Sequence, residues 1–77
     1  MAKRGQKIPY RVLYVHENGV CGTIQAHSRF EAHTKARVPM LVGATVTIVQ
    51  VGDDGARTVL AWYATLEDLE AAINAAL

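Results

Sequence analysis

Residues 28–38 read SRFEAHTKARV, and whether they form a helix or a strand decides the fold of this chain. Apolar and polar residues alternate along the stretch, which is the period of a half-buried strand. Ser28 and Glu31, however, have the spacing of a capping box, in which Ser28 accepts a hydrogen bond from the Glu31 amide and Glu31 reaches back to the Ser28 amide. Glu31 and Lys35 have the spacing of a favourable ion pair on a helix. We therefore predict a helix, which Pro39 ends.

The residues before this stretch predict a hairpin. Residues 8–16 are rich in Tyr, Val and Leu, and residues 20–27 alternate small or apolar side chains with more polar ones. Between them, Asn18 and Gly19 are the pair that a two-residue type I′ turn prefers, because both of its central residues have positive φ. We expect two antiparallel strands here.

The residues after it predict a second hairpin and a second helix. Residues 44–51 are mostly β-branched, residues 52–55 (GDDG) form a reversal, and residues 57–63 return as a strand. Thr65 and the acids that follow it are typical of a helix N-terminus. The apolar stripe of this helix consists of Leu66, Leu69, Ile73 and Leu77.

The resulting order is ββαββα, which predicts an α+β fold: a four-stranded antiparallel sheet with two helices on one face. The two halves of the chain contain similar turn and cap motifs at nearly the same spacing. Asn18 and Gly19 recur 36 positions later as Asp54 and Gly55, whereas the Ser28 cap recurs after 37 positions as a threonine. Two related ββα units explain this similarity, and so does shared turn and cap chemistry alone.

Length and composition allow one small domain of 77 residues. We expect residues 8–77 to form it and residues 1–7, which carry three bases, to be a flexible basic arm. The single cysteine excludes an intramolecular disulfide. No apolar run suits a signal core or a membrane span, so we expect a cytoplasmic protein with no membrane partner.

The net charge of +1 conceals an asymmetry. Residues 1–51 hold seven bases and two acids, whereas residues 52–77 hold one base and five acids. Such a pattern is typical of solvated surface, and it also suits an acidic partner or head-to-tail self-association. Nucleic acid is therefore the alternative partner, although no recognition helix or RNP motif is present. The bases that would contact its phosphates are Lys3, Arg4, Lys7 and Arg11.

Catalysis and metal binding find little support in the sequence. The residues that zinc sites commonly use are His16, Cys21, His27 and His33. Successive members from Cys21 onward are six residues apart, whereas structural zinc ligands usually come in pairs two to five residues apart. The common nucleotide-binding and hydrolase motifs are missing. We predict no enzyme activity, no metal and no cofactor.

Two of the expected strands are apolar on both faces. Strict alternation in residues 57–63 places Val59 on the face opposite Leu60 and Trp62. A sheet with helices on one side needs only one apolar face, so the other face is either covered or exposed. A long loop at residues 38–43, or a helix, would cover it.

An exposed second face would be an interface, because aromatic residues are enriched where partners bind. Tyr10 and Tyr14 must share one face of their strand, and Trp62 joins them only if the pairing register places it there. We predict an interface of these three residues, which binds a partner protein or forms a homodimer.

The chain resembles, in general style, the small orphan products of bacteriophages with GC-rich hosts. It is short, it is rich in Ala, Val, Gly and Arg, and it begins with a basic segment. The resemblance implies a phage accessory protein that binds a host protein of the bacterial cytoplasm, and it transfers no functional residue.

Overall fold

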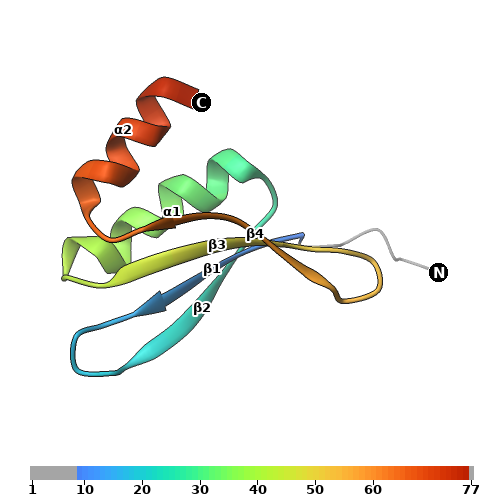
Figure 1. The fold of residues 1–77 in the computed structure, drawn as a ribbon, viewed down its shortest axis with the longest axis horizontal. Coiled ribbons are helices and arrows are strands. Elements are labelled where there is room, and N and C mark those ends of the chain that lie inside the picture. The colour runs from blue at the N-terminus through green and yellow to red at the C-terminus, as the bar shows by residue number, and fades with distance from the viewer. Residues whose placement is uncertain (1–8, 77) are drawn as a thin grey trace.

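The computed structural model describes residues 9–76, so the predicted basic arm and Leu77 lie outside the described residues. The elements follow the predicted order ββαββα (Figure 1). They are β1 (Tyr10–Val15), β2 (Cys21–Ala26), α1 (Arg29–Leu41), β3 (Thr45–Val51), β4 (Arg57–Tyr63) and α2 (Leu66–Ala76). The α+β class is confirmed, and residues 29–38 belong to a helix that Ser28 caps.

The four strands form one antiparallel sheet in the order β2-β1-β3-β4. Both helices lie on one face of it, as predicted (Figure 1). Helix α1 packs across β1, β2 and β3, whereas α2 packs against α1 and β4. Within residues 9–76, no helix is long and apolar enough to cross a membrane.

The hydrophobic core lies between the sheet and the helices, because every second side chain of β1, β2 and β3 points toward α1. Its buried members are Val12, Ala26, Ala32, Ala36, Met40, Val46, Ile48 and Leu69. The small Ala32 and Ala36 side chains let α1 approach the sheet closely. Leu66 and Ile73 are half-buried beside fully buried Leu69, which confirms the predicted stripe within the described part of α2.

The two hairpins have the same loop, which differs from the two-residue turn predicted at Asn18 and Gly19. In the β1–β2 loop, the amide of Gly19 donates to the His16 carbonyl and the amide of His16 donates to the Val20 carbonyl. This pattern encloses three loop residues, and Gly19 has φ +90°. The side chain of Asn18 accepts from the Val20 amide, as Asp54 does from the Ala56 amide in the β3–β4 loop.

Corresponding motifs of the two halves are 36 residues apart at the hairpin loops and 37 apart at the helix caps, and a β-bulge in β4 accounts for this difference. Ile48 pairs with Ala61 but Val49 pairs with Val59, which leaves Leu60 as the extra residue. The hairpin loops before the bulge are therefore related by 36 positions and the helix caps after it by 37.

Helix α1 begins as predicted but ends three residues later than predicted. Pro39 lies inside the helix, which continues to Leu41. Pro39 has no amide to donate to the carbonyl four residues before it, so the helix loses that hydrogen bond, and it continues for only two residues beyond. The helix stops instead at Gly43, which has φ +93°, where the amides of Gly43 and Ala44 donate to the carbonyls of Met40 and Pro39. Residues 38–43 are therefore not a loop that covers the sheet.

The capping box at the start of α1 is shifted by one residue. Ser28 accepts from the Glu31 amide at 3.0 Å, but Glu31 accepts from the amide of His27 rather than of Ser28. This hydrogen bond and the Lys35 ammonium hold the pKa of Glu31 below its ordinary value of 4.5.

We expect Glu31→Gln to flatten the acid side of the stability profile. Because the folded-state pKa of Glu31 is lowered, its contribution is present above the unfolded-state pKa and is lost as the pH falls through the folded-state pKa. Melting temperatures measured from about pH 6 to about pH 3 should fall less in the variant than in the wild type. Glu17→Gln, in the β1–β2 loop, is the control. An acid profile identical to the wild type in Glu31→Gln would contradict this account.

Candidate interaction surface

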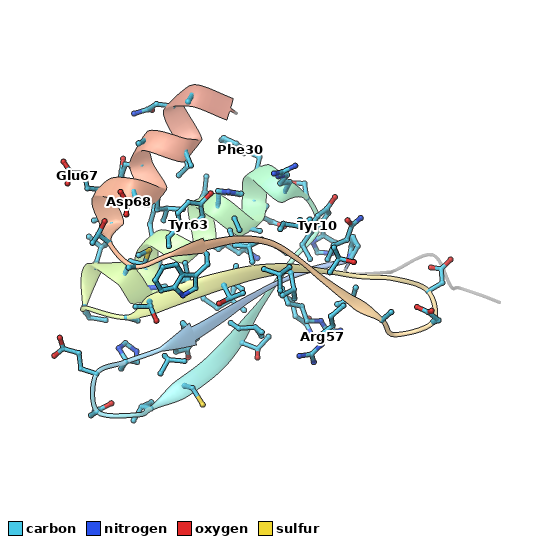
Figure 2. All side chains as sticks on the ribbon, in the orientation of Figure 1. Tyr10, Phe30, Arg57, Tyr63, Glu67 and Asp68 are labelled. Carbon is cyan, nitrogen blue, oxygen red and sulfur yellow. The ribbon has the colours of Figure 1, made fainter. Side chains whose placement is uncertain are left out.

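The face of the sheet that points away from the helices is uncovered by any described element. We call it the open face. The paired registers place on it Arg11, Leu13 and Val15 of β1, Cys21, Thr23 and Gln25 of β2, Thr45, Thr47, Val49 and Val51 of β3, and Arg57, Val59 and Trp62 of β4. Figure 2 shows Arg57 on this side, and Tyr10 and Tyr63 on the helix side.

The bulge at Leu60 brings two apolar side chains of β4 together on the open face. Val59 pairs with Val49 and Trp62 pairs with Thr47, and both of these β3 residues belong to the open face. Without the extra residue, alternation would place Val59 and Trp62 on opposite faces. They are 65% and 61% exposed, and Leu60 packs against the core instead.

Val49 shows that the open face has a small packed centre of its own. It is only 2% exposed, although it belongs to the face that no helix covers. Its direct neighbours across the strands are Arg11 and Val59, so the apolar stem of Arg11 is placed to cover it. The Nε atom of Arg11 is buried and has no hydrogen-bond partner.

The predicted interface of Tyr10, Tyr14 and Trp62 is not one surface. Tyr10 and Tyr14 lie on the helix side, half-buried against the core, because they share the parity of buried Val12. Trp62 lies on the opposite side of the sheet. Gly22 leaves room for the Tyr14 ring on this side, because a Cβ at Gly22 would lie 2.6 Å from Tyr14 Cζ.

Charge on the open face has one sign. The four strands contain no Asp or Glu, so its charged side chains are Arg11 and Arg57. Of the bases predicted for nucleic-acid binding, Arg11 is on this face, and Lys3, Arg4 and Lys7 are outside the described residues.

A shallow groove of about 230 Å³ lies on the helix side, beside the last turn of α1. It is lined by Tyr14, His16, Ile24, Val38, Pro39 and Val42. Val38 and Val42 are 68% and 71% exposed. The sequence analysis missed this groove, because it exists only where α1 continues through Pro39.

The histidines and the cysteine are dispersed. Cys21 is exposed on β2, and His33 is buried in α1. His33 Nδ1 lies 2.8 Å from the Arg29 carbonyl and donates to it, and in the neutral imidazole Nε2 then accepts from the Tyr63 hydroxyl at 3.0 Å. Among residues 9–76, no three His, Cys, Asp or Glu side chains lie close enough together to hold a metal ion.

Comparison of the chain with models of protein families, with curated proteins and with solved structures finds no match.

Proposed function

We propose that this chain is a non-enzymatic binding protein whose open face binds a partner protein. The observation that carries the proposal is the pair of exposed side chains, Trp62 and Val59, that the β4 bulge gathers on a rigid sheet. Tryptophan is the residue type most enriched at the centres of interfaces, where one aromatic anchor supplies much of the binding energy. A contiguous apolar patch rimmed by polar side chains typically marks an interaction site.

The surroundings of Trp62 fit a protein interface. Thr47 lies beside it and Leu13 one strand further, and Arg11 and Arg57 supply cationic groups at the rim. Threonine hydroxyls and arginines can hydrogen-bond backbone and carboxylate groups of a partner. The phage-like style of the sequence supports a host protein of the bacterial cytoplasm as this partner.

Nucleic acid is the second candidate, and one observation favours it. Arg11, Arg57 and Trp62 share a face that carries no acid, which is the combination of cationic groups and a stacking surface that single strands bind. A titration with a labelled single-stranded oligonucleotide at low salt tests it, because phosphate contacts are strongest there. Binding that weakens steeply with salt and disappears in Arg57→Ala would favour this candidate over the first.

We expect Trp62→Ser to weaken partner binding by at least about 30-fold, the effect of losing a hot-spot residue. The test is capture from a lysate of the native host, followed by titration of the captured protein against purified variants. Trp62 is 61% exposed, so the circular dichroism spectrum of the variant should stay native.

Val38→Ser is the matched control, since Val38 is equally exposed but lies on the helix side. It should leave partner binding within about 2-fold of the wild type. Loss of binding in Val38→Ser with binding retained in Trp62→Ser would move the site to the groove beside α1 and refute the proposal.

A further inference from the structure

Within residues 9–76, no further strand lies beside β2 or β4, the two edge strands of the sheet. Hydrogen-bond alternation shows which backbone groups point outward from each edge. In the β3–β4 pair, the amide of Gly52 donates to the Ala56 carbonyl. Hydrogen-bonded pairs recur at every second position, so residues 50 and 58 also form one. The residues of β4 that lie between such pairs point their N–H and C=O groups away from β3. With the bulge included, the outward residues of β4 are Arg57, Val59 and Trp62.

The β2 edge is protected against another strand. Its outward residues are Cys21, Thr23 and Gln25, all with polar or small side chains. The ammonium group of Lys35 donates to the Gln25 carbonyl at 3.0 Å, which occupies one of the outward acceptors. A lysine over a sheet edge is a common device against edge-to-edge pairing.

On the β4 edge, the features that work against pairing are the bulge and the charge of Arg57. Strand β4 contains neither lysine nor proline, and the side chains of two of its outward residues are the exposed Val59 and Trp62. An edge strand of seven residues with two exposed apolar side chains is a template for a further strand.

The bulge restricts which strand can pair there. The outward residues of β4 are spaced by two and then by three positions, because the backbone groups of both Leu60 and Ala61 point toward β3. A regular strand presents outward groups at every second residue, so it matches β4 on one side of the bulge only. A strand that matches on both sides must carry the same irregularity.

We propose that β4 pairs antiparallel with β4 of a second copy of this chain, in a symmetric dimer with one eight-stranded sheet. The proposed register places Val59 of each copy opposite Trp62 of the other. The two bulges then lie opposite each other. The three-residue spacing then agrees on both strands. A twofold axis makes this match automatic, because the same edge serves both subunits.

The side chains fit the same register. The two Val59–Trp62 pairs lie side by side on the open face, and aromatic side chains pair favourably with β-branched ones across strands. Arg57 lies opposite Ala64 of the second copy, so no like charges face each other. The dimer joins the open faces of both subunits into one surface. The proposed dimer does not depend on the proposed function, and it is tested on the purified chain alone.

We expect the purified chain to form dimers in sedimentation analysis, and Val59→Pro to raise the dimer dissociation constant at least about 10-fold. Proline at this position removes an outward N–H and leaves the β3–β4 ladder intact. Thr23→Pro makes the same change on the β2 edge and should alter the dissociation constant less than about 2-fold. A chain that is monomeric up to about millimolar concentration, or equal effects of both prolines, would overturn the proposal.

Crosslinking tests the register without relying on the proline variants. In the triple variant C21S, R57C, A64C, oxidation should yield a covalent dimer, because positions 57 and 64 face each other across the proposed interface. The two positions lie about 20 Å apart within one subunit, too far for an internal disulfide. The variant C21S, R57C should remain monomeric on a denaturing gel. Absence of the covalent dimer from the triple variant would refute this register and with it the matched bulges.

Discussion

Leu69→Ala is expected to lower the free energy of unfolding by about 2–5 kcal/mol, the range for large-to-small changes in a packed core. Leu69 is fully buried, and among residues 66–75 it is the one α2 side chain that belongs to the buried members of the core. Among the described elements, α2 contacts only α1 and β4, so its position depends on these two contacts. Small domains have stabilities near the lower end of about 5–15 kcal/mol, which makes this loss a large fraction of the total.

Urea denaturation followed by far-ultraviolet circular dichroism measures this effect. Ile73→Ala is the comparison on the same stripe, and its loss should be smaller, because Ile73 is only half-buried. A loss below about 0.5 kcal/mol for Leu69→Ala would mean that α2 does not pack as described.

His33→Ala is expected to be the second large effect, at about 2–4 kcal/mol. The imidazole is 3% exposed and joins α1 to β4 through its hydrogen bond with the Tyr63 hydroxyl. Its removal leaves a cavity and takes away the partner of that hydroxyl. Tyr63→Phe removes only the hydroxyl and should cost about 1–2 kcal/mol, because the buried Nε2 then lacks a donor.

The double variant separates the hydrogen bond from the packing. If the two groups interact as the distances show, the losses of His33→Ala and Tyr63→Phe are non-additive by about 1 kcal/mol. Tyr10→Phe is the control, since Tyr10 is half-buried on the same side of the sheet but does not contact His33 through a hydrogen bond. Additive losses within about 0.3 kcal/mol would contradict the coupling.

Local chemistry made most of the fold predictable. Side-chain oxygens at Ser28 and Thr65 accept from the amides three residues later, so both helices begin where the sequence analysis placed them. The strand predicted at residues 57–63 has these bounds in the structure. These features depend on residues within one turn or one strand, and neighbours in sequence determine them.

The end of α1 was not predictable from the same rules. Proline disfavours a helix interior by removing one hydrogen bond and crowding the preceding turn. Here the buried Pro39 packs near the end of a helix that Gly43 terminates, and tertiary packing outweighs the local preference. The groove beside Val38 and Val42 follows from these extra residues.

The candidate site was predictable in part. Trp62 was identified, but Tyr10 and Tyr14 were placed with it although they lie on the helix side. Val59 was missed, because strict alternation separates it from Trp62. Alternation along one strand says which residues share a face of that strand, but it does not relate that face to the faces of other strands.

The sequence by itself determined the element order, the helix starts and the glycines of the two hairpin loops, because each depends on short-range hydrogen bonds and allowed φ angles. Only the tertiary structure decided which side chains meet on the open face. The pairing of β3 with β4 takes up one extra residue at Leu60, and this bulge reverses the alternation between Val59 and Trp62. A register shift is a property of two strands paired across a sheet, so no single stretch of sequence shows it.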